Sequence, residues 1–74
     1  MNYDKIREHV FEKYALYVTL TTRAYQLVHK STWGSERYQK AWRMAEYFRG
    51  QSRALSYCLH TIDLRIKAQR EQTL

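Results

Sequence analysis

The scarcity of chain-breaking residues constrains this sequence more than any other feature. The 74 residues contain no proline and only two glycines, Gly34 and Gly50. Strand-rich folds need many turns, which glycine and proline usually supply, whereas a helix interior needs neither. Hydrophobic residues make up 45% of the chain and aromatic residues 15%, which is typical of a packed structure and not of a solvated tail. The sequence therefore predicts an all-α protein with long helices.

The first helix is predicted over about residues 2–30. One helical face collects apolar and aromatic side chains at intervals of three and four residues, as a buried stripe requires. Asn2 can cap the start of this helix, and Asp4 suits the positive end of its dipole. The members of this first seam are Tyr3, Ile6, Val10, Tyr14, Tyr17, Thr21, Ala24 and Val28.

A tight turn is predicted over about residues 31–35, and a second helix over about residues 35–70. Gly34 can take the left-handed conformation that closes a helix, and Ser35 can cap the next one, with Glu36 in its first turn. The second seam consists of Ala41, Ala45, Phe48, Ser52, Leu55, Leu59, Ile62 and Ile66. The two seams mirror each other about the turn, so we expect an antiparallel two-helix hairpin that forms one domain over residues 1–74.

Gly50 lies inside the second helix, and its role has two interpretations. The helical spacing of the apolar residues continues past Gly50 without a shift. This favours one long helix, straight or bent at Gly50, over two separate helices. Gly50 points away from the seam, on a line of small and aromatic residues. This line either receives another backbone at close range, or leaves Gly50 exposed at a cost of about 1 kcal/mol relative to alanine.

A two-helix hairpin cannot cover all the apolar side chains of this sequence. Leu16, Leu20 and Leu27 lie off the first seam, and the line through Gly50 adds further apolar positions on the second helix. Aligned exposed apolar residues are typical of interfaces. We therefore expect a homodimer in which two hairpins form a four-helix bundle. The predicted interface residues are Leu16, Leu20, Leu27, Tyr47, Gly50, Ala54, Tyr57 and Leu64.

The charge pattern predicts an anionic partner. The chain has 13 Lys and Arg against 7 Asp and Glu, a formal net charge of +6. Many of the basic residues cluster around the turn, where aromatic residues interleave with them; such a surface can bind phosphates by charge and bases by stacking. The predicted nucleic-acid contacts are Lys30, Trp33, Arg37, Tyr38, Lys40, Arg43, Arg49 and Arg53. Two lysines are expected to pair with acids within the second helix, Lys40 with Glu36 and Lys67 with Asp63. The alternative is that the positive charge serves only solubility.

Catalytic and metal-binding patterns are not found in the sequence. The histidines His9, His29 and His60 lack the spacing of a metal site, so we expect no enzyme, no cofactor and no metal. Cys58, the only cysteine, is expected to be a small buried hydrophobe in a reducing compartment. No stretch reaches the roughly 20 apolar residues of a membrane span, and the N-terminus does not resemble a signal peptide. We therefore expect a cytoplasmic protein with neither a membrane nor a small-molecule substrate among its partners.

Two functions are compatible with these features. The first is a small, self-associating regulatory protein that binds DNA or RNA through its basic, aromatic surface. The alternative is an adaptor or inhibitor that docks on a larger protein through the line that contains Tyr47, Gly50, Ala54 and Tyr57.

Overall fold

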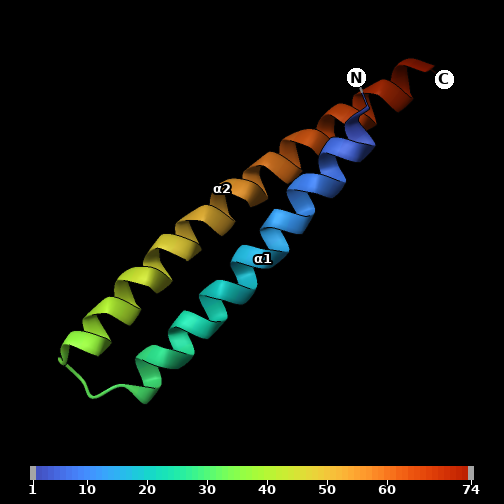
Figure 1. The fold of residues 1–74 in the computed structure, drawn as a ribbon. Coiled ribbons are helices and arrows are strands. Elements are labelled where there is room, and N and C mark those ends of the chain that lie inside the picture. Colours follow the sequence, from blue (N-terminus) through green and yellow to red (C-terminus); the bar gives the residue numbers. More distant parts are fainter. Residues whose placement is uncertain (1, 74) are drawn as a thin grey trace.

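The computed structural model describes residues 2–73 and consists of two helices joined by a short loop. Helix α1 spans Tyr3–Lys30 and helix α2 spans Glu36–Thr73. The helices run antiparallel, so the start of α1 and the end of α2 lie at one end of the hairpin, the open end, and the loop lies at the other (Figure 1). The predicted all-α hairpin is confirmed.

Side-chain caps define the start of both helices. The Oδ1 of Asn2 accepts a hydrogen bond from the backbone N–H of Lys5 at 3.3 Å. The Oγ of Ser35 accepts one from the backbone N–H of Tyr38 at 3.1 Å. Each cap satisfies one of the backbone donors that a helix leaves unpaired in its first turn. Both predicted caps are therefore confirmed.

The end of α1 differs from the prediction. Gly34 does have a positive φ, 80°, but it lies within the loop and does not close the helix. The helix ends at Lys30, and the capping residue Ser31 has an extended backbone. The backbone N–H of Ser31 donates to the carbonyl of Val28 at 3.3 Å, and its hydroxyl donates to the carbonyl of Leu27 at 2.7 Å. Because Ser31 satisfies these carbonyls, the last turn needs no left-handed residue.

The fully buried core is small and lies in the half of the hairpin next to the loop. It consists of Ala24, Val28, Ala41 and Ala45 among the described residues. Ala45 is 0% exposed, which places it at a close contact between the helices. Alanine suits this position because a small side chain lets two helix backbones approach each other. Every other residue of the two seams is half-buried except Ile6, which is 39% exposed.

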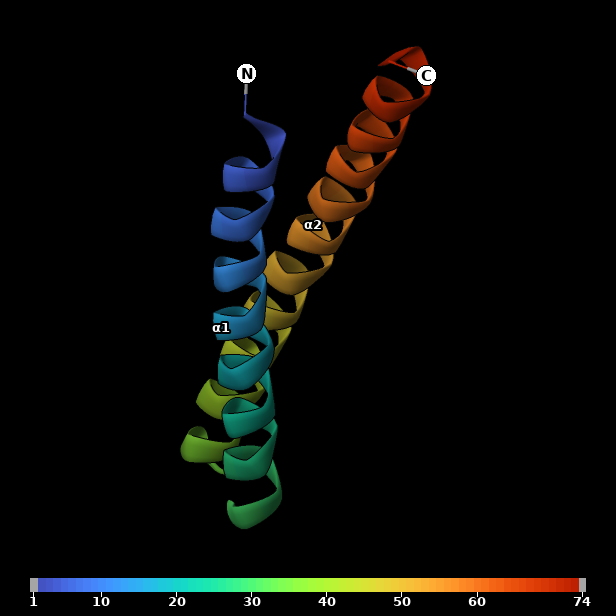
Figure 2. The same ribbon diagram turned by 90° about the vertical axis from the view of Figure 1, so that its right-hand side faces the viewer.

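The helices diverge toward the open end, as Figure 2 shows. The seam residues in that half, such as Val10, Leu59 and Ile62, are only half-buried. A salt bridge between Arg7 and Asp63 spans the two helices there. Asp63 thus pairs across the hairpin, and its predicted pairing with Lys67 is wrong. Intrahelical spacing had suggested Lys67, whereas the antiparallel packing brings Arg7 to the same carboxylate.

Helix α2 continues through Gly50 without interruption (Figure 1). Gly50 is exposed, and a Cβ atom built on it would meet no other atom within 4 Å. The interpretation of one long second helix is therefore correct. Within the hairpin itself, Gly50 is not used for a close backbone contact.

Candidate interaction surfaces

The loop end carries an exposed aromatic pair. Trp33 is 84% exposed, and its ring centroid lies 6.3 Å from that of Tyr38, with the ring planes at 48°. Tyr38 is half-buried in the first turn of α2, where Ser35 binds its backbone N–H. Most of the Trp33 indole surface therefore remains available to a partner.

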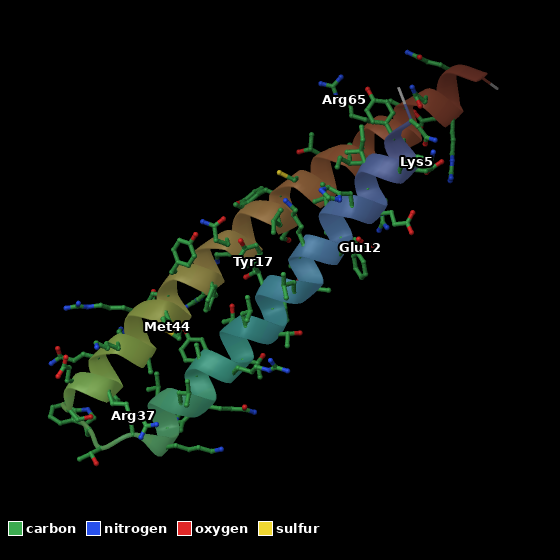
Figure 3. The ribbon with its side chains drawn as sticks, in the orientation of Figure 1. Lys5, Glu12, Tyr17, Arg37, Met44 and Arg65 are labelled. Carbon is green, nitrogen blue, oxygen red and sulfur yellow. The ribbon has the colours of Figure 1, made fainter. Side chains whose placement is uncertain are left out.

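Four Lys and Arg residues lie at positions 30–43, on both sides of Trp33 in the sequence. Lys30, Arg37, Lys40 and Arg43 are all exposed. We define the basic tip as these four residues together with Trp33 and Tyr38. The Nζ of Lys40 lies 3.6 Å from a carboxylate oxygen of Glu36, as predicted. This pair is exposed on both sides and therefore weak. The other three cations have no ionic partner within the described part of the chain. Figure 3 shows Arg37 beside the loop, at the opposite end of the molecule from Lys5 and Arg65.

Two of the predicted nucleic-acid contacts lie apart from the basic tip. Arg53 follows Arg37 by 16 residues, which corresponds to about 24 Å along the helix axis. Arg49 follows Lys40 by nine residues. This spacing gives a net rotation of about 180° around the helix axis, so the two side chains point to opposite sides of α2. Arg53 lines an open hollow of about 390 Å³ with Ser56, Tyr57 and His60. The eight predicted contacts therefore form two separate groups.

A second surface lies on the side of α2 that faces away from α1. Tyr47 is 59% exposed, Tyr57 is 76% exposed, and Leu64 is 54% exposed. Gly50 and Ala54 lie between the two tyrosines and are exposed as well. The predicted line of small and aromatic residues is therefore a continuous solvent-facing strip of the hairpin.

A third surface, which we call the leucine edge, consists of Leu16, Leu20 and Leu27 on α1. Leu16 is 55% exposed and Leu27 is 42% exposed, whereas Leu20 is half-buried. All three lie about a quarter turn away from the seam that contacts α2. Helix α2 therefore leaves this edge largely uncovered.

The middle of α1 carries no charge on any side. Residues 14–22 contain no acidic or basic side chain. The threonine hydroxyls of this segment all donate to backbone carbonyls four residues earlier, Thr19 to Ala15 at 3.0 Å, Thr21 to Tyr17 at 2.7 Å and Thr22 to Val18 at 3.1 Å. Such hydroxyls need no water partner. This segment is therefore suited to contact with another apolar surface.

Sequence reasoning also misplaced Cys58 and missed an aromatic contact. Cys58 is exposed, not buried as predicted. It lies in the open half of the hairpin, where the diverging helices leave the flanks of the seam uncovered. The missed contact is an edge-to-face pair of Tyr25 and Trp42, with ring centroids 6.0 Å apart. These two positions are nearly opposite each other in the hairpin register, which is the signal that could have revealed the pair.

The described residues contain no candidate metal site. No group of three His, Cys, Asp or Glu side chains within them is placed to hold a metal ion. Neither described helix has an apolar stretch that is long enough to cross a membrane. Comparison with known proteins found no matching family model, no similar curated protein and no similar solved structure. The exposed surfaces of the hairpin are therefore the features that bear on its function.

Proposed function

We propose that this protein is a small, non-catalytic regulatory protein that self-associates and binds nucleic acid, DNA or RNA, through its basic tip. The observation that carries this proposal is the 84% exposure of Trp33 in the end of the hairpin that also carries three exposed cations with no ionic partner among the described residues. An indole this exposed offers a large flat ring face to a partner. Aromatic rings within a basic surface bind single-stranded nucleic acid by stacking on bases, while the cations bind phosphates.

The self-association part of the proposal rests on the shape of the hairpin. Its radius of gyration is 17.1 Å, whereas a compact chain of this length has about 11 Å. Its accessible surface is 6209 Å², against about 4,800 Å² for a typical monomer of this mass. This surplus exceeds the roughly 800 Å² that each partner contributes to a standard protein interface. The single hairpin therefore has enough surplus surface for a stable dimer.

Titration with salt tests the nucleic-acid part of the proposal. The double variant Arg37→Ala/Lys40→Ala removes two cations from the basic tip. We expect weaker binding to single-stranded oligonucleotides, and a slope of log K against log salt that is smaller by about 1 to 2. The matched control is Lys5→Ala/Arg65→Ala, which removes two charges at the open end (Figure 3). Equal loss in both variants would mean that the tip has no special role.

The strip on the outer side of α2 supports a second candidate function. Tyr47 and Tyr57 are more exposed than the leucine edge, and Gly50 between them has free space around it. These features suit docking on a larger protein, in an adaptor or inhibitor role. If the chain does not bind nucleic acid even at low salt, this alternative replaces the first proposal.

A further inference from the structure

The uncharged segment of α1 is centred on Val18, and its two leucines are placed symmetrically about that residue. It covers residues 14–22 and is bounded by Lys13 and Arg23. Leu16 and Leu20 of the leucine edge lie two residues on either side of Val18. A surface with this symmetry can pack against an identical surface that runs in the opposite direction, because a two-fold axis pairs mirrored positions.

Two opposite charges share the same centre. Glu12 and Arg23 are eleven residues apart, which is close to three full helical turns, so they lie along one side of the leucine edge. Their midpoint falls between Tyr17 and Val18. Both side chains are exposed and have no ionic partner within the described residues. About 16 Å separates them along the helix axis, so they cannot pair within one chain. Figure 3 shows Glu12 directed away from α2.

We propose that two copies of this chain associate through their leucine edges with the α1 helices antiparallel. In this arrangement Leu16 of each copy lies against Leu20 of the other, and Glu12 of each copy pairs with Arg23 of the other. A parallel arrangement would instead place Glu12 beside Glu12. The proposal rests on the self-association part of the proposed function and specifies its interface and orientation.

The antiparallel orientation has a consequence for the basic tip. Lys30 lies 12 residues from Val18, so the two Lys30 residues of the dimer are about 36 Å apart along the axis. The two basic tips therefore point away from each other at opposite ends of the dimer. A dimer of this kind can hold two nucleic-acid segments at once, whereas a dimer with both tips at one end presents a single enlarged site.

Charge exchange at the two paired positions tests the interface. We expect Glu12→Arg and Arg23→Glu each to raise the dimer dissociation constant about tenfold at low salt, because each creates two like-charge contacts. The double variant Glu12→Arg/Arg23→Glu should restore the wild-type value, as measured by sedimentation equilibrium. Glu8→Arg is the matched control, since it makes the same charge change at an exposed position one turn away and off the edge. Failure of the double variant to recover would overturn the proposed pairing.

Labels at the loop test the orientation independently. Spin labels on Thr32→Cys, in a chain that also carries Cys58→Ser, should give a distance between the two copies of about 40 Å. A distance below about 25 Å would place both tips at one end and overturn the antiparallel arrangement, while self-association would stand. A chain that stays monomeric at every soluble concentration would refute self-association itself, whatever its affinity for nucleic acid.

Discussion

The Nε of Arg7 donates a hydrogen bond to the Oδ1 of Asp63 at 2.7 Å, and this contact joins residues 56 positions apart in the sequence. It bridges the two helices in the half where they diverge and no described residue is fully buried. The loop half differs, because Ala24 and Ala45 are buried there. The two halves of the hairpin therefore differ in how closely their helices pack.

The ion pair at the open end should contribute little to global stability. Its side chains are 43% and 51% exposed, and pairs at such positions are worth less than about 1 kcal/mol. We expect Asp63→Asn to lower the free energy of unfolding by no more than this amount, and less at high salt, as measured by urea denaturation. Hydrogen exchange should become faster near Arg7 and Asp63 while remaining unchanged near Ala45. A loss of several kcal/mol would contradict this expectation.

Overpacking the contact at Ala45 should be far more damaging. Ala45 is 0% exposed between the helices, so Ala45→Leu should cost about 1–3 kcal/mol because the helices must separate to admit the larger side chain. Ala54→Leu is the control, since Ala54 is exposed on the same helix. Thermal unfolding followed by circular dichroism compares the two. Similar melting temperatures would show that the helices do not approach closely at Ala45.

Gly50 should be replaceable by alanine with a gain in stability. A Cβ at this position meets nothing within 4 Å, and alanine is favoured over glycine in a helix by about 1 kcal/mol. We therefore expect Gly50→Ala to raise the free energy of unfolding of the hairpin. Reduced stability or impaired self-association would indicate that another backbone lies against Gly50, as the docking interpretation of this strip requires.

Removal of the Trp33 ring should affect binding but not folding. Because Trp33 is 84% exposed, Trp33→Ala should leave helicity and melting temperature unchanged. Its loss should weaken binding to single-stranded nucleic acid by about 1–3 kcal/mol, the usual contribution of one stacked base. Trp42→Ala provides the contrast, because Trp42 packs on Tyr25 and its removal should lower stability instead. Fluorescence anisotropy with a labelled oligonucleotide measures the binding effect.

The starts of both helices and the continuity of α2 were predicted correctly, because they follow local rules. Asn2 and Ser35 cap helices because their side chains reach backbone donors only three residues ahead. The burial of Ala41 and Ala45 follows from helical periodicity, which can be read from a short stretch of the sequence. The continuity of α2 through Gly50 followed from the same unbroken phase.

Features that depend on how the two helices meet could not be predicted in this way. Periodicity indicates which side of a helix is apolar, but it does not predict how closely the two helices approach at each position along their axes. The sequence therefore treated Cys58 as buried, whereas the divergence of the helices leaves it exposed. It likewise paired Asp63 with the nearest cation in sequence, although the hairpin brings Arg7 to that carboxylate.

The sequence by itself determined two long helices, their N-terminal caps and the apolar seams that join them, because these properties depend on side chains within a few residues of one another. The tertiary structure alone decided where the core is fully buried, which charges pair and which apolar residues remain exposed to water. These properties depend on the distance between the helices at each position along the hairpin. Alanines allow a close contact near the loop, and the diverging open half leaves Val10 and Leu59 only half-buried.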